Sequence, residues 1–170
     1  QSGDTDEQDY LRIIYNKTAS LFEAACLSAA VSVGASDVLE RAVVDYAVAL
    51  GLAFQIKDDI LDYDGTESVG KPLGADVLEQ KMTLPLLGAL AAVGQEEADR
   101  VRGLVKDIVA HPERRDEIVR FVRENGGLEY ARTRLDEYVT TSIEALSVFP
   151  SSQEKDFLVE LAYFTAKRDR

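Results

Sequence analysis

The spacing of apolar residues constrains the fold of this chain most strongly. Apolar side chains recur every three or four positions in seven segments between residues 8 and 168, which is the period of a helix with one buried face. No segment alternates at every second position, as a half-buried strand would. Proline occurs only four times, each time where a helix can begin or end. The sequence therefore predicts an all-α fold.

Capping residues and glycines set the predicted helix boundaries. The expected N-caps are Thr5, Ser36, Asp37 and Ser151. The residues expected to end helices are Gly34, Gly126 and Gly127. The predicted helices span 8–33, 36–63, 83–93, 95–110, 113–125, 127–148 and 152–168.

Length and composition narrow the class of protein. A chain of 170 residues with 46% apolar and 29% charged residues is expected to form a single all-α unit over 1–170. Its net charge of -12 and the lack of any long Lys/Arg run argue against nucleic-acid binding. A single cysteine, Cys26, excludes an internal disulfide framework and suits a reducing cytoplasm.

The chain start and its apolar runs bear on location. No apolar run reaches the 18 or more residues needed to cross a bilayer, so an integral membrane protein is not expected. The acidic start, QSGDTDEQDY, is unlike a secretory signal, and a cytoplasmic location is predicted. Because no initiating methionine is present, the chain is expected to be processed or to be a piece of something longer.

Two polar residues interrupt an apolar helix stripe near the start of the chain. Lys17 and Thr18 follow Ile14 by three and four positions, on the stripe that Tyr10 begins. Lys17 is either a snorkelling lysine at the edge of the stripe or, with Thr18, a binding group aimed into a polar cavity. The spacing alone leaves both interpretations open.

Four polar residues then share one face of the second long helix. Gln55, Asp58, Asp59 and Asp62 stand at i, i+3, i+4 and i+7, and the negative charges of the three aspartates repel one another. A hard divalent cation such as Mg²⁺ would relieve this repulsion, because it prefers oxygen ligands. The alternative is an acidic face that is merely solvated.

The next segment adds cations beside these acids. Lys71 and Asp76 lie in a stretch framed by Gly70 and Gly74, and Lys81 comes shortly after it. The segment is not a phosphate loop of the GxxxxGK[ST] type. Lysines beside a carboxylate cluster supply point charges suited to diphosphate oxygens.

Together these motifs resemble the trans-polyprenyl diphosphate synthases, in order and spacing, across nearly the whole chain. The closing LAYFTAKRDR is similar to the C-terminus of long-chain members such as the octaprenyl diphosphate synthases. The matching segments are KTASLFEAAC at 17–26, GLAFQIKDDILDY at 51–63, GKPLGAD at 70–76 and KMTLPLL at 81–87.

The resemblance implies a bundle of long helices around a deep cavity, where two aspartate-rich motifs hold Mg²⁺ against an allylic diphosphate. The resemblance implies that the catalytic residues are Lys17, Thr18, Gln55 and Lys71. It implies that substrate is bound by these four residues together with Lys81 and Arg168. It implies that the metal ligands are Asp58, Asp59, Asp62 and Asp76.

The reaction that the resemblance implies needs no covalent protein nucleophile. An allylic diphosphate ionises, isopentenyl diphosphate attacks the carbocation, and a proton is lost. The first aspartate-rich motif and the isopentenyl diphosphate pocket of the family are absent before Lys17. This chain is therefore expected to be the C-terminal half of an enzyme, inactive alone. Smaller departures are Gln80 and Ala47, where the family usually has glycine.

Two rival functions stay open. One is a non-catalytic or regulatory subunit of a heteromeric synthase, although such subunits are expected to lose the aspartates that this chain keeps. The other is a terpene cyclase, against which the Lys17–Thr18 pair and the GK and TLP segments argue.

Apolar side chains are also expected to be left uncovered. They should pack against a missing N-terminal half or a second subunit, or be buried by homo-oligomerisation. These side chains are Leu21, Phe22, Leu27, Val31, Leu50 and Phe54.

Overall fold

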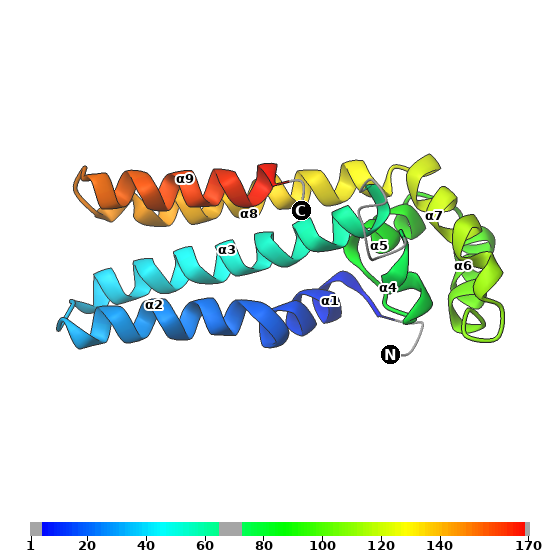
Figure 1. Ribbon diagram of the computed structural model, residues 1–170, viewed down its shortest axis with the longest axis horizontal. Coiled ribbons are helices and arrows are strands. Elements are labelled where there is room, and N and C mark those ends of the chain that lie inside the picture. Colours follow the sequence, from blue (N-terminus) through cyan, green and yellow to red (C-terminus); the bar gives the residue numbers. More distant parts are fainter. Residues whose placement is uncertain (1–4, 65–72, 169–170) are drawn as a thin grey trace. The chain divides into compact units, whose positions relative to one another are not determined.

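The computed structural model describes residues 5–64 and 73–168, and every regular element in these ranges is helical (Figure 1). The prediction of an all-α fold is therefore confirmed. The elements are α1 (Glu7–Ile14), the π-helical turn η1 (Tyr15–Ala19), α2 (Ser20–Ser32), α3 (Asp37–Asp64), α4 (Ala75–Leu78), α5 (Leu84–Ala91), α6 (Gln95–Lys106), η2 (Pro112–Arg114), α7 (Arg115–Glu124), α8 (Gly127–Ala145), η3 (Leu146–Val148) and α9 (Gln153–Lys167).

The described residues fall into two compact units. Unit 1 contains residues 5–10, 58–64 and 73–133, and unit 2 contains residues 11–57 and 134–168. Helices α3 and α8 each contribute residues to both units. That residues 1–170 act as one unit stays a prediction.

In unit 1 the helices α4, α5 and α6 pack against α7, and α5 also packs against α6 (green to yellow in Figure 1). Every residue of α5 except Ala91 is buried. Thr83, just before α5, donates a hydrogen bond of 3.2 Å to the fully buried hydroxyl of Tyr63. Burial raises the pKa of Tyr63 above its usual range, although the Thr83 hydrogen bond opposes this. The TLP segment thus fixes the end of α3.

Unit 2 contains α2, most of α3, and α9. A sharp turn at Gly34, whose φ of +66° lies in the left-handed region, joins α2 to α3. The hydroxyl of Tyr46 on α3 donates a hydrogen bond of 2.9 Å to the carbonyl oxygen of Leu158 on α9. Burial of this hydroxyl raises the pKa of Tyr46 to about 12.

Two predicted N-caps are wrong by one residue. The side chain of Ser152, not Ser151, accepts a hydrogen bond of 3.2 Å from the Lys155 N–H at the start of α9. At α1 the carboxylate of Asp6, not Thr5, accepts from the Asp9 N–H at 2.8 Å. Adjacent residues that can both cap make the two positions hard to separate from sequence.

The predicted helix stops are mostly correct. Gly34 and Gly126 both have positive φ and lie where helices end, so these two stops are confirmed. Gly127 is instead the first residue of α8. Its neighbour Gly126 already supplies the left-handed conformation that the turn needs, so the second glycine is free to begin the next helix.

The first predicted helix is interrupted by a π-helical turn. The N–H of Ser20 donates to the carbonyl oxygen of Tyr15, five residues earlier. The extra residue rotates α2 by about 100° relative to a regular continuation of α1. Tyr10 and Ile14, before the turn, are buried, whereas Leu21, seven positions after Ile14, is 70% exposed.

Exposed apolar side chains lie on α2 and α9. Of the six side chains expected to be uncovered, Leu21 and Val31 are exposed, whereas Leu50 is buried. Leu50 belongs to the face of α3 on which Tyr46 and Ala53 are also buried. The other three, Phe22, Leu27 and Phe54, are half-buried. On α9 the exposed apolar side chains include Phe157, Leu161 and Phe164.

Candidate active site

The three aspartates of the acidic motif occupy the last two turns of α3, in unit 1, and have different surroundings. Asp58 and Asp62 are half-buried, whereas Asp59 is only 4% exposed. The buried hydroxyl of Tyr10 on α1 donates a hydrogen bond of 2.7 Å to a carboxylate oxygen of Asp59. A charge-assisted bond of this length stabilises the buried anion and fixes its orientation.

Asp62 holds the start of α4. Its two carboxylate oxygens accept hydrogen bonds of 3.1 Å from the backbone N–H groups of Ala75 and Asp76, one each. Its carbonyl oxygen accepts from the Gly74 N–H at 2.7 Å. The first N–H groups of a helix need such acceptors, and a negative charge there is favourable. Asp62 therefore positions Asp76 through the backbone.

Asp76 is paired with Lys81. The Lys81 ammonium lies 2.8 Å from a carboxylate oxygen of Asp76 and 2.6 Å from one of Glu79. Burial lowers the pKa of Lys81, but the hydrogen bonds to these two carboxylates outweigh it, so that pKa is raised overall. Lys81 thus stays a cation and orients the carboxylate of Asp76.

In unit 2 the π-helical turn and α3 bring Thr18 and Gln55 together. The Thr18 hydroxyl donates a hydrogen bond of 3.0 Å to the amide oxygen of Gln55, which is 7% exposed. Lys17 precedes Thr18 on the same turn and is exposed. The interpretation of Thr18 as part of a polar group on this helix face is supported by this bond.

Arg168 lies on Phe54, the residue before Gln55. Its guanidinium carbon is 4.0 Å from the ring centroid, and one of its N–H groups donates to the Phe54 carbonyl oxygen at 2.9 Å. This is a cation–π arrangement combined with a hydrogen bond. Arg168 is thereby anchored beside Gln55 within unit 2. The predicted site residue Lys71 lies outside the described residues.

The acidic motif has the donor atoms that a hard divalent cation requires, since all the predicted metal ligands are carboxylates. Among residues 5–64 and 73–168, no three carboxylate, imidazole or thiol side chains converge on one point. Carboxylates such as these fit a cation that takes one or two protein ligands and completes its shell with water and phosphate oxygens, as Mg²⁺ does.

Tyr10 was not predicted as a site residue, because its position in the sequence indicated only an apolar stripe. A buried tyrosine hydroxyl needs a polar partner, and an aspartate on an apolar helix face needs a donor. The sequence shows both a tyrosine that needs a polar partner and an aspartate that needs a donor. It does not show their pairing, because 49 residues separate Tyr10 from Asp59.

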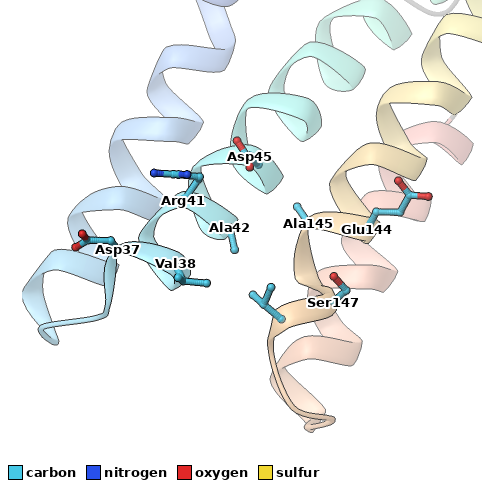
Figure 2. A pocket seen from close by; sticks show the side chains of 9 residues that line it. Asp37, Val38, Arg41, Ala42, Asp45, Glu144, Ala145 and Ser147 are labelled. Atoms are coloured by element: carbon cyan, nitrogen blue, oxygen red, sulfur yellow. The ribbon is translucent and has the colours of Figure 1, made fainter.

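A cavity of about 320 Å³ lies elsewhere in unit 2, between the first turns of α3 and the end of α8 (Figure 2). Its walls include Asp37, Arg41 and Asp45 on α3 and Glu144 on α8. Asp45 precedes Gln55 by ten residues, or roughly 15 Å of helix. None of the predicted site residues lines this cavity.

No helix within the described ranges is long and apolar enough to cross a membrane.

Comparison with known proteins identifies the family. The polyprenyl synthetase family model matches residues 1–122. Octaprenyl diphosphate synthases of Haemophilus influenzae and Escherichia coli are 38% and 36% identical over 98% of this chain, but the matches cover 50% and 52% of those proteins. A crystal structure of a Caulobacter crescentus polyprenyl synthase complexed with calcium and isoprenyl diphosphate is 36% identical, with a TM-score of 0.88. The match covers 99% of this chain and 52% of the Caulobacter crescentus chain. The chain thus spans about half the length of these relatives, and it belongs to the polyprenyl synthetase family.

Proposed function

We propose that this chain forms the C-terminal half of a trans-polyprenyl diphosphate synthase. The complete enzyme would condense isopentenyl diphosphate with an allylic diphosphate to give a polyprenyl diphosphate. The observation that carries the proposal is the Asp58–Asp59–Asp62 motif, whose buried member is held by Tyr10 and whose last member fixes α4. Such a preorganised acidic motif suits electrostatic catalysis rather than covalent catalysis.

The residues of this chain would bind and activate the allylic diphosphate. The Lys17 ammonium would hold its oxygens. The Thr18 hydroxyl, which donates its one proton to Gln55 in this structure, would donate that proton to a diphosphate oxygen on substrate binding. We assign Lys71 the same role as a second cation. As the C–O bond breaks, its electron pair leaves with the diphosphate, and these groups stabilise the added negative charge. The carbocation is then attacked by the double bond of isopentenyl diphosphate, and the resulting cation loses a proton to the released diphosphate.

A divalent metal, Mg²⁺ in this proposal, would neutralise charge on the leaving diphosphate. Asp58 would be a protein ligand of the metal, with Asp59 held in place beside it by Tyr10 and Asp62 by two backbone N–H groups. Asp76 would act from beside Lys81 on the metal-bound water molecules. The calcium complexed with the Caulobacter crescentus polyprenyl synthase supports a divalent-cation site in the family.

The partners follow from the missing half. We propose that a polypeptide carrying the first aspartate-rich motif completes the site, either as the rest of the same chain or as a second subunit, and that the assembly is a homo-oligomer. The support is the half-length match to the relatives and the exposed apolar side chains of α2 and α9. A cytoplasmic location is proposed on the single cysteine.

Radiolabelled isopentenyl diphosphate tests this function. The full-length protein should convert it, with an allylic diphosphate and Mg²⁺, into a polyprenyl product, and residues 1–170 alone should form none. Adding a separate polypeptide with the first motif should restore product formation. Steady turnover by residues 1–170 alone would contradict the half-enzyme assignment. Absence of turnover by the full-length protein would instead favour the non-catalytic subunit.

A further inference from the structure

The π-helical turn Tyr15–Ala19 approaches α3 closely at a glycine. Ala19, the last residue of this turn, is fully buried, and its Cα faces Gly51 on α3. A Cβ atom at position 51 would lie 2.6 Å from the Ala19 Cα, 2.8 Å from the Ala19 Cβ and 3.4 Å from a ring carbon of Phe22. Since the nearest of these atoms is backbone, a side chain rotation cannot relieve the overlap. Only glycine allows this approach.

The same two segments meet again one residue and one turn away. Thr18 precedes Ala19, and Gln55 follows Gly51 by four positions, on the same face of α3. The hydrogen bond of 3.0 Å between Thr18 and Gln55 therefore lies next to the glycine contact. The two contacts together fix the turn that carries Lys17 and Thr18 against α3.

A methyl group at position 51 would separate these segments. An ordinary van der Waals contact starts at 3.4 Å. A Cβ added at position 51 would lie 2.6 Å from the Ala19 Cα, so these two atoms would have to separate by about 0.8 Å. A shift of that size would take the Thr18–Gln55 distance beyond the 3.5 Å limit of a hydrogen bond. It would also displace the neighbouring Lys17.

We propose that Gly51 is a positioning residue for the diphosphate-binding pair Lys17 and Thr18, acting through its close contact with Ala19. This inference rests on the proposed function, since it assigns a purpose to the contact only if these two residues bind an allylic diphosphate. It goes beyond that function by naming a residue without a side chain as a determinant of substrate affinity.

The test is Gly51→Ala in the full-length enzyme, with KM measured separately for the two substrates. The KM for the allylic diphosphate, and the Kd for inorganic diphosphate with Mg²⁺ by calorimetry, should both rise on the order of ten- to a hundredfold, as for a lost hydrogen bond to a charged group. The KM for isopentenyl diphosphate should change less than about twofold. A crystal structure of the variant should show the Thr18–Gln55 distance above 3.5 Å.

Two glycines provide matched controls. A Cβ at Gly103 on α6 meets nothing within 4 Å, so Gly103→Ala should neither lower the stability of the protein nor raise the KM for either substrate. A Cβ at Gly88 on α5 would meet the Tyr130 side chain at 2.6 Å, so Gly88→Ala should destabilise the protein without raising the KM for the allylic diphosphate. An equal rise in that KM in Gly88→Ala and Gly51→Ala would reduce Gly51 to a general packing residue.

If Gly51→Ala does not fold, the double variant with Ala19→Gly answers the question. It removes the Ala19 Cβ from the overlap but keeps the 2.6 Å approach to the Cα, so a weakened affinity for the allylic diphosphate should persist. Normal KM values in whichever variant folds would overturn the inference. Lys17→Ala separates this failure from that of the proposed function. If Lys17→Ala weakens allylic binding and the Gly51 variants do not, only the inference fails.

Discussion

Replacing Tyr10 by phenylalanine removes one hydroxyl and nothing else from the buried side of the acidic motif. Tyr10 is 3% exposed and Asp59 4% exposed, so water cannot readily replace the hydrogen bond of 2.7 Å between them. A hydrogen bond to a charged group contributes about 1.5–3 kcal/mol, and a buried acceptor that loses its donor costs a similar amount. We expect Tyr10→Phe to lower the free energy of unfolding by about 2 kcal/mol.

Urea unfolding of the full-length protein, followed by circular dichroism, measures this change. Tyr163→Phe is the matched control, because Tyr163 lies on α9 in unit 2 and is 50% exposed. The control should change the free energy of unfolding by less than about 0.5 kcal/mol. An equally small effect of Tyr10→Phe would refute the argument that Tyr10 stabilises the Asp59 carboxylate.

Three further predictions concern other parts of the chain. Folding raises the pKa of Tyr46 from 10.0 to about 12, so its neutral form stabilises the fold fully below pH 10, and this contribution is lost as the pH rises from 10 to 12. Tyr46→Phe should therefore make the free energy of unfolding less dependent on pH between 10 and 12. Gln80 has a φ of 56°, and its side chain donates a hydrogen bond of 2.6 Å to the Lys106 carbonyl oxygen. Gln80→Gly and Gln80→Ala both lose that bond, but only glycine relieves the backbone strain, so Gln80→Gly should be more stable than Gln80→Ala by roughly 1 kcal/mol in thermal or urea unfolding. The reverse order of stability would contradict the strain. Residues 1–170 alone should bind a hydrophobic dye or self-associate through the exposed faces that include Leu21 and Phe164, whereas an 18.7 kDa monomer without dye binding would show that these faces need no partner.

The sequence predicted the helices well, because their apolar period and their stops are local properties. The ends of α3 and α9 differ from the predicted boundaries by one residue, and Gly34 turns where expected. The π-helical turn was not predicted, since it adds no residue type of its own to the pattern. Leu21 is 70% exposed, as expected of a side chain left uncovered, although it follows the buried Ile14 by seven positions.

The candidate site was predicted as a set of residues but not as a set of contacts. Spacing alone put Asp58, Asp59 and Asp62 on one helix face, as α3 requires. The spacing could not show that Asp59 accepts a hydrogen bond from Tyr10, because the two residues are far apart in sequence. It also could not show that Asp62 caps α4, because a segment without a helical sequence pattern separates them. The usual glycine of the family at position 80 is explained by the positive φ of Gln80.

Substitution of Asp58 tests the central claim most directly. In the full-length enzyme Asp58→Ala should lower kcat by at least about a hundredfold, which corresponds to about 2.7–4 kcal/mol of lost transition-state stabilisation for one preorganised group. Lys57, its neighbour in the motif, lies off the acidic face of α3, so Lys57→Ala should keep kcat within about twofold. The proposed function predicts a hundredfold loss of kcat in Asp58→Ala and no such loss in Lys57→Ala. Near-normal turnover of Asp58→Ala would contradict it.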